Sequence, residues 1–251
     1  MLESKPVRTP LDHDVHLMAT PADVEPESSF PYAMAIGSLM YAALGTRPDI
    51  SFAVQHLAQF TSRPSAAHIT AVKRIFRYLN GTRNFRLTYR SDGDSSLTGY
   101  TDADWASSAV DCRSVTGYVF TLARGSISWS SAKQCSVATL SMESEYMALA
   151  HATKEAIWLR SLFSDLHLLS DGPTPLHADN RAAISYAHND QFHKRSKHID
   201  VRYHFTRERL ISNEISVPYC ASADNFADLF TKALARPSHE TQVARIGLRA
   251  P

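Results

Sequence analysis

The stretch that decides the fold is LTGYTDADW, residues 97–105, in which a short apolar run ends in acidic residues. This pattern is typical of a strand that carries a carboxylate, here Asp102, to the edge of a sheet. Asp179 follows a second short apolar run in the same way, whereas Glu145 and Asp228 lie in segments with helical spacing. Two strand ends and two helices that cover one sheet can bring their carboxylates together. We therefore expect these four residues to form one site.

The side-chain types of this expected site indicate metal chemistry. Mg²⁺ prefers oxygen ligands, and two such ions about 4 Å apart stabilise both the attacking and the leaving oxygen in phosphodiester cleavage. The sequence therefore predicts a two-metal nuclease centre that binds two Mg²⁺ ions, with Mn²⁺ as the alternative metal.

Short motifs along the chain carry a resemblance to a known family. In chain order they are YTDADWA (100–106), RSVTGY (113–118), ESEYMAL (143–149), ADN (178–180), KHID (197–200) and ADLFTK (227–232). In this order and spacing they resemble the ribonuclease H domain of Ty1/copia-type retrotransposon polyproteins. Further motifs upstream resemble the end of the reverse transcriptase of the same polyprotein: IGSLMY (36–41), TRPDI (46–50) and RYLNGT (77–82).

The resemblance implies a fold, an activity and a set of metal ligands. The fold would be α/β and ribonuclease H-like, a mixed five-stranded sheet with helices on its faces, preceded by a small helical segment. The activity would be Mg²⁺-dependent hydrolysis of the RNA strand of RNA–DNA hybrids. Asp102 would be shared by both ions, with Glu145 and Asp179 on one side and Asp228 on the other.

One motif of the family is absent. Its polymerase active site carries an aromatic-x-Asp-Asp sequence, and no Asp-Asp pair occurs in the 251 residues. The chain therefore cannot polymerise by that mechanism and is interpreted as the tail of a polyprotein. The reverse transcriptase part of the same polyprotein is an expected partner.

The sequence divides into four stretches. Residues 1–30 are rich in proline and predict an extended lead segment without a fold of its own. Residues 31–94 predict three amphipathic helices, a thumb- or connection-like remnant of reverse transcriptase. Residues 95–236 predict the ribonuclease H domain, and 237–251 a tail. Within the domain we expect an antiparallel meander (strands near 97–102, 116–122 and 126–130), a helix at 141–169, a strand at 175–178, a helix from Asp179, a helix at 198–210, a strand at 215–220 and a final helix from Asp224.

Helical geometry separates Glu145 from its neighbour Glu143. Two residues two positions apart on a helix differ by about 200° around the axis, so they face opposite sides. Glu145 shares its face with apolar residues that would contact the sheet. Glu143 falls in the first turn behind Ser141, the expected N-cap, where the helix dipole favours an acidic side chain. The pattern therefore favours Glu145 as the metal ligand.

The other acidic residues keep simpler explanations. Asp102 and Asp104 would share one face of a strand, so their spacing does not separate them, and only the resemblance selects Asp102. Asp179 could be a helix N-cap, and Asp228 could form a surface ion pair with Lys232. These alternatives stay open on the residues alone.

Several further residues are candidates for substrate contact or proton transfer. Lys194, Arg195 and Lys197 form a basic run that would contact phosphates, although a solvated loop is the simpler explanation. His198 is a candidate for protonating the leaving oxygen or for product release, against a core or capping role. A zinc site at these histidines lacks paired thiols. Asn180 and Gln134 are the candidates for hydrogen bonds to the 2′-hydroxyl of RNA.

Composition limits the functional classes. A net charge of +1 means that any basic surface for nucleic acid must be local. The three cysteines are far apart, which argues against a disulfide framework and a structural zinc site and favours a reducing compartment. The sequence has neither a membrane-length apolar run nor the apolar core of a signal peptide. We therefore expect an intracellular protein, cytoplasmic or nuclear and not secreted, with no membrane partner.

Two other functional classes compete with the nuclease. One is a catalytically silent, nucleic-acid-binding remnant of a degraded element, although all four carboxylates are present. The other is an exonuclease or an integrase of a related fold. An exonuclease would show Asp-x-Glu where Asp102-Ala103-Asp104 stands, and an integrase uses three acidic ligands instead of four. The exonuclease and the integrase therefore fit less well than ribonuclease H.

Overall fold

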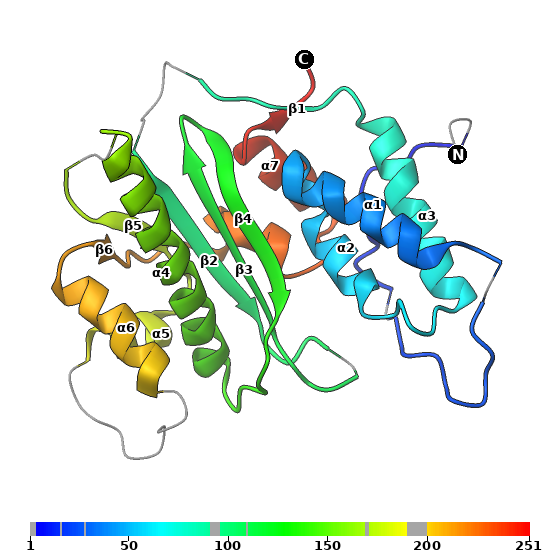
Figure 1. Cartoon of the computed structure of the whole chain (residues 1–251), viewed down its shortest axis with the longest axis horizontal. Helices are drawn as coiled ribbons and strands as arrows, with labels where there is room; N and C mark the ends of the chain where they lie inside the picture. Colours follow the sequence, from blue (N-terminus) through cyan, green and yellow to red (C-terminus); the bar gives the residue numbers. More distant parts are fainter. Residues whose placement is uncertain are drawn as a thin grey trace.

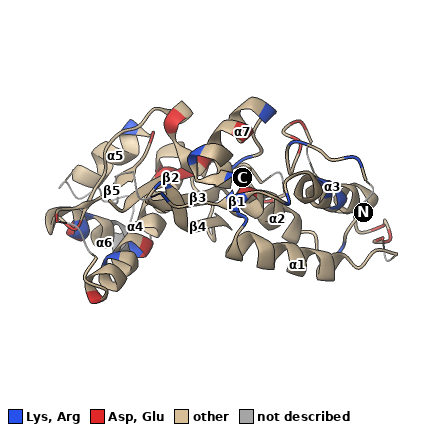
Figure 2. Cartoon of the chain, turned by 90° about the horizontal axis from the view of Figure 1, so that it is seen from above, with Lys and Arg blue, Asp and Glu red and all other residues tan. Residues whose placement is uncertain are grey.

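The computed structural model describes residues 4–15, 17–27, 29–90, 96–108, 110–168, 171–189 and 200–251. A sheet and its covering helices form one half of the molecule, and three helices form the other (Figure 1). Figure 2 shows basic and acidic residues on both halves, and their nearly equal numbers give the small net charge. Within the described residues, no helix is both long and apolar enough to cross a membrane.

The sheet has five strands in the order β4-β3-β2-β5-β6. The strands β2 (Thr98–Asp104), β3 (Val115–Leu122) and β4 (Gly125–Lys133) form an antiparallel meander. The strand β5 (Thr174–His177) lies parallel to β2, and β6 (Ile215–Ser216) lies parallel to β5. This topology confirms the α/β, ribonuclease H-like fold with a mixed five-stranded sheet.

Alternation along β3 explains why both faces of the sheet are covered. Tyr118 and Phe120 belong to one apolar cluster, which includes residues of α4 (Ser141–Asp165) and α5 (Arg181–His188). Val119 between them belongs to another, which includes residues of η3 (Phe226–Phe230) and α7 (Arg236–Arg245). Successive side chains of a strand point to opposite faces. The long helix α4 therefore covers one face, and the C-terminal segments cover the other (Figure 1).

The second half of the molecule consists of α1 (Tyr32–Gly45), η1 (Pro48–Ile50), α2 (Ser51–Ala58) and α3 (Ala66–Gly81). These helices enclose their own apolar core, and Leu11 and Leu17 of the lead segment are buried in it. The core also includes Val115 of β3, so the two halves are packed against each other. Trp129 Nε1 of β4 adds a hydrogen bond to the Ala43 carbonyl of α1, at 2.9 Å.

A buried polar network lies where the helices meet α7. Arg47 Nη2 lies 2.7 Å from Asp49 Oδ2, and the same carboxylate oxygen accepts a hydrogen bond from Tyr78 Oη at 2.6 Å. His239 Nε2 of α7 lies 3.2 Å from Tyr78 Oη. The TRPDI motif therefore supplies the charged pair that connects the helices to the C-terminal part of the chain.

Several elements differ from the prediction. The helix expected from Asp179 begins at Arg181, and the one expected from Asp224 is two short 3-10 helices, η2 (Ser222–Asp224) and η3. The α4 N-cap is Leu140 and not Ser141, and α4 ends at Asp165. The strand expected at 215–220 is only two residues long, with an isolated bridge from Ala178 to Tyr219. The helix expected at 198–210 is described from Asp200 as α6 (Asp200–Ile211).

The stretch at 237–251, which the sequence analysis separates as a tail, is mostly regular structure. It contains most of α7 and the strand β7 (Leu248–Arg249), which pairs with β1 (Arg86–Leu87). Val243, Ile246 and Leu248 are buried in the cluster on the η3 face. Apolar residues at these positions hold the segment against the sheet.

Candidate metal centre

Three of the four predicted carboxylates meet at one edge of the sheet. Asp102 lies in β2 and Glu145 in the first part of α4, and Asp179 is the second residue after β5. Each offers an oxygen, and these oxygens all lie within 4.8 Å of one another. The helical phase of α4 and the parallel pairing of β2 with β5 account for this convergence.

The fourth carboxylate, Asp228 in η3, reaches Asp102 from the other face of the sheet. Gly117 makes this approach possible, since it is the β3 partner of Asp102. A Cβ atom at Gly117 would lie 2.7 Å from the Thr231 side chain and 2.8 Å from that of Phe230. The missing side chain therefore allows η3 to lie directly on the sheet beside Asp102.

Burial and mutual repulsion dominate the electrostatics. Burial, followed by Asp102 and Asp179, raises the pKa of Glu145 to about 9. Burial and then Asp102 raise the pKa of Asp228 to about 7, despite Lys232. Carboxyl groups with raised pKa values are expected where like charges are held together, and cations relieve that repulsion. A set of close carboxylate oxygens is also the donor set that hard divalent cations prefer. The residues therefore fit a divalent metal centre.

Lys232 and Thr231 hold the Asp228 side of the centre. Lys232 Nζ lies 2.9 Å from Asp228 Oδ1 and 3.8 Å from Asp102 Oδ2. Burial acts to lower the pKa of Lys232, but Asp102 and Asp228 outweigh it and raise the pKa above its ordinary value. Thr231 Oγ1 donates a hydrogen bond to Asp102 Oδ2.

Ser222 and Asn225 fix other parts of the site. Ser222 Oγ donates to Asp179 Oδ2 at 2.6 Å, which orients that carboxylate. Asn225 Nδ2 donates to the Thr101 carbonyl at 3.0 Å, and Asn225 Oδ1 accepts from the Ala227 amide. The buried Asn225 thus ties the start of η3 to β2, next to Asp102.

The neighbouring acidic residues take other roles. Glu143 is buried, and its Oε2 accepts hydrogen bonds from the amide and the hydroxyl of Thr139, both at 2.8 Å. Asp104 lies at the end of β2 and is not a member of the three-carboxylate group. Burial, followed by the charge of Asp102, raises its pKa, whereas Lys232 lowers it.

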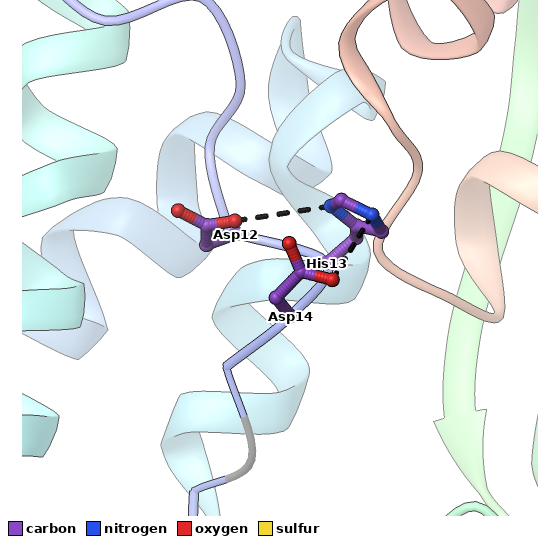
Figure 3. Close-up of side chains that lie close together, drawn as sticks. All are labelled: Asp12, His13 and Asp14. Atoms are coloured by element: carbon purple, nitrogen blue, oxygen red, sulfur yellow. Dashed lines mark ion pairs between the residues drawn. The ribbon is translucent and has the colours of Figure 1, made fainter.

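A second group of possible ligands, Asp12, His13 and Asp14, lies in the lead segment (Figure 3). His13 Nε2 lies 3.1 Å from Asp14 Oδ1, and His13 Nδ1 lies 3.8 Å from Asp12 Oδ1. Asp12 is also 3.4 Å from Arg74 Nη1. These contacts, together with the Arg74 ion pair, account for the group without a metal ion.

The sequence relates the chain to retrotransposon polyproteins over its full length. It is 39% identical over 255 residues to the Retrovirus-related Pol polyprotein from transposon TNT 1-94 of Nicotiana tabacum, an alignment that covers 100% of this chain and 19% of that protein. It is 38% identical over 248 residues to the corresponding protein from transposon RE1 of Arabidopsis thaliana, covering 99% of this chain and 17% of that protein. The chain belongs to the copia-type retrotransposon Pol polyproteins. It spans about a fifth of the length of these relatives.

Other proteins are similar to parts of this Pol segment. A 129-residue stretch, 51% of the chain, is 48% identical to 91% of the Secreted RxLR effector protein 161 of Plasmopara viticola. Among solved structures, LC11-RNase H1 in complex with RNA/DNA hybrid is 16% identical, with a TM-score of 0.41, and the alignment covers 54% of this chain and 94% of that one. RNase H1 from Halobacterium salinarum gives a TM-score of 0.40 with the same identity and coverage. No family model matches the chain.

The two residues predicted to read the 2′-hydroxyl have structural hydrogen bonds in the Pol segment. Asn180 is the N-cap of α5, and its Oδ1 accepts from the Ala183 amide at 3.0 Å. Gln134 is 6% exposed, and its Nε2 donates to Thr116 Oγ1 at 2.9 Å and to the Ser144 carbonyl at 3.0 Å. Their contact with substrate stays a prediction.

The basic run Lys194, Arg195 and Lys197, together with His198, lies outside the described residues. Their predicted roles therefore stay predictions as well.

The prediction from sequence did not include Ser222, Asn225 or Thr231 and treated Lys232 only as a partner of Asp228. Thr231 and Lys232 lie inside the ADLFTK motif, which was the available signal. No local pattern marks Ser222, because its hydrogen bond spans 43 positions of the sequence.

Proposed function

We propose that this Pol segment is a ribonuclease H that hydrolyses the RNA strand of RNA–DNA hybrids with two Mg²⁺ ions, or with Mn²⁺ in their place. The observation that carries the proposal is the convergence of Asp102, Glu145 and Asp179 at one sheet edge, with Asp228 reaching Asp102 from the opposite face. Membership of the copia-type Pol polyproteins supports it. All four predicted carboxylates take part in this arrangement.

The chain's own residues would position the ions and the substrate. Asp102 lies between the two groups and would be shared, with Glu145 and Asp179 on one side and Asp228 on the other. When bound, the divalent cations supply Lewis acidity that activates water and offsets negative charge on the leaving oxygen. Ser222 and Thr231 donate hydrogen bonds to Asp179 and Asp102, so these carboxylates would be oriented before substrate arrives.

The residues predicted from the sequence would bind the substrate and protonate the leaving group. Lys194, Arg195 and Lys197 would contact phosphates, and His198 would assist the leaving oxygen. Asn180 and Gln134 would read the 2′-hydroxyl. The reverse transcriptase part of the same polyprotein would be the partner that delivers the hybrid. The unpaired cysteines Cys112, Cys135 and Cys220 support a reducing, intracellular compartment.

The test is cleavage of a hybrid that carries a label on the RNA strand, with and without Mg²⁺. Duplex DNA and duplex RNA of the same sequence serve as controls. We expect cleavage of the RNA in the hybrid alone, and only with the metal. A folded chain that binds the hybrid without cutting it would favour the catalytically silent remnant. Equal cutting of duplex DNA would contradict hybrid specificity.

A further inference from the structure

The two sides of the centre differ in how their negative charge is balanced. On one side, Asp102, Glu145 and Asp179 lie within 4.8 Å of one another, and no ion pair to Glu145 or Asp179 is seen in the described part of the chain. On the other side, the Lys232 ammonium lies 2.9 Å from Asp228 and 3.8 Å from Asp102. A lysine cation thus stands between the two carboxylates that would hold the second metal ion.

The ammonium group of Lys232 can move away from the two carboxylates. Its side chain is 39% exposed, whereas those of Asp228 and Asp102 are 14% and 3% exposed. A lysine ammonium sits on a flexible four-carbon stem and is strongly hydrated in water. It can therefore turn out to solvent while the carboxylates, held by the sheet and by Thr231, stay in place.

We propose that Lys232 is a built-in counter-cation that occupies the second metal position until a divalent ion displaces it. The centre would then load in order. Asp102, Glu145 and Asp179 would hold the first ion, and Asp102 and Asp228 would hold the second only when Lys232 withdraws. The inference rests on the proposed function only in taking these carboxylates as metal ligands.

The ordered loading predicts two classes of Mn²⁺ binding. Mn²⁺ alone, without nucleic acid, would be counted by electron paramagnetic resonance of the free ion and by calorimetry. We expect the wild-type chain to bind one ion well and a second one weakly. Lys232→Met keeps the stem and removes the charge, so the second ion should bind about tenfold more tightly or better, because two cations about 4 Å apart repel strongly. Lys232→Arg keeps the charge and should keep the weak second site.

Lys154→Met is the matched control, because Lys154 is an exposed residue of α4 outside this centre. It should bind Mn²⁺ as the wild type does. Asp228→Asn tests the same idea in a variant with less repulsion, so its folding is not at risk. It should bind one ion at every concentration, and the combination with Lys232→Met should do the same.

Two results of the Mn²⁺ binding measurements would overturn the proposal. One is a second-site affinity that stays within twofold of the wild type in Lys232→Met. The other is a second Mn²⁺ bound by Asp228→Asn. Loss of hybrid cleavage in Lys232→Met with unchanged Mn²⁺ binding would also overturn it and would assign Lys232 to the substrate phosphate. Ordered Mn²⁺ binding by a chain that cuts no hybrid would sustain the inference while refuting the proposed function.

Discussion

Asp102 is the residue on which the centre depends most. It is 2% exposed, and it lies close to Glu145 and Asp179 on one side and to Asp228 on the other. Its position follows from β2, whose pairing with β3 places it opposite Gly117. The role of the residue therefore combines charge with fixed placement.

Asp102→Asn should abolish hybrid cleavage and leave the fold intact, because the amide keeps the shape and removes the charge that the metals would share. The metal-free protein should become more stable, since repulsion with Glu145 and Asp228 is relieved. A gain of about 1 kcal/mol would raise the melting temperature by about 2–4 °C. Calorimetry without Mg²⁺ measures it, and retained cleavage would remove Asp102 from the site.

The raised pKa values predict how metal-free stability depends on pH. The folded pKa values of Glu145 and Asp228, about 9 and about 7, exceed the ordinary values of 4.5 and 3.8. The folded chain then binds protons more tightly than the unfolded chain. This contribution is complete below about pH 4 and is lost as pH rises through 7 and 9. The melting temperature in a metal chelator should therefore show a fall from pH 5 to 9 that is smaller in Asp102→Asn. A fall of the same size in both proteins would contradict the shared repulsion.

At the scale of elements, α4 decides which glutamate enters the centre. Glu145 faces the sheet edge, whereas Glu143 turns back to accept two hydrogen bonds from Thr139. The sequence prediction of Glu145 rested on the same helical phase, and this phase places Glu145 beside Asp102 and Asp179 although α4 begins with a different N-cap. Its role as a metal ligand stays a prediction.

Glu145→Gln should reduce hybrid cleavage as severely as Asp102→Asn, because both changes remove a charged metal ligand. Glu143→Gln is the matched control. It should leave the turnover number near that of the wild type and cost about 1 kcal/mol of stability through weaker hydrogen bonds to Thr139. Steady-state kinetics and urea unfolding separate the two effects, and the reverse order of the variants would mean that Glu143 is the ligand.

The contact of η3 with the sheet gives a second prediction at this scale. Gly117→Ala places a Cβ atom against Thr231 and Phe230, so η3 must shift and move Asp228 away from Asp102. We expect at least about a tenfold loss of cleavage, since small misplacements of catalytic groups are costly. Gly37→Ala in α1 is the control: a Cβ there meets nothing within 4 Å, and a helix gains about 0.5–1 kcal/mol. Unchanged cleavage in Gly117→Ala would show that η3 tolerates the shift.

At the scale of the whole molecule, the helices and the sheet are joined by polar groups as well as by apolar packing. Asp49 has a fully buried side chain that pairs with Arg47 and accepts from Tyr78, which contacts His239 of α7. Trp129 adds its hydrogen bond from β4 to α1. The contact between the two halves therefore includes the buried charges of Arg47 and Asp49, which must remain paired.

Asp49→Asn should lower the free energy of unfolding by about 3–5 kcal/mol, because it leaves Arg47 buried with a charge that has lost its counter-ion. Glu240→Gln removes a partner from the exposed Arg236–Glu240 pair and should cost less than about 0.5 kcal/mol. Urea unfolding measures both, and similar costs for the two variants would refute the importance of the buried pair.

The sequence was most informative where structure is local. The β-forming residues of 116–122 predicted β3, alternation along residues 126–130 predicted β4, and helical spacing around Glu145 predicted α4 and its buried face. It was least informative where distant contacts decide. Asn225 stabilises a 3-10 segment through Thr101, 124 positions away, and no local pattern encodes that hydrogen bond. Lys232 looked like an ordinary i,i+4 partner because its distance to Asp102 depends on the packing of η3 against the sheet.

The ribbon of β1 and β7 has a consequence for how the part of the chain that carries the four carboxylates can be handled. Leu87 pairs with Leu248 and Arg86 with Arg249, so residues 88–247 leave and return at one point of the molecule. Folded units whose two ends meet tolerate transfer into a loop of another protein. The sheet, its covering helices and the four carboxylates therefore lie in one continuous segment whose two ends meet. This segment could be inserted as a unit into a loop of a host protein.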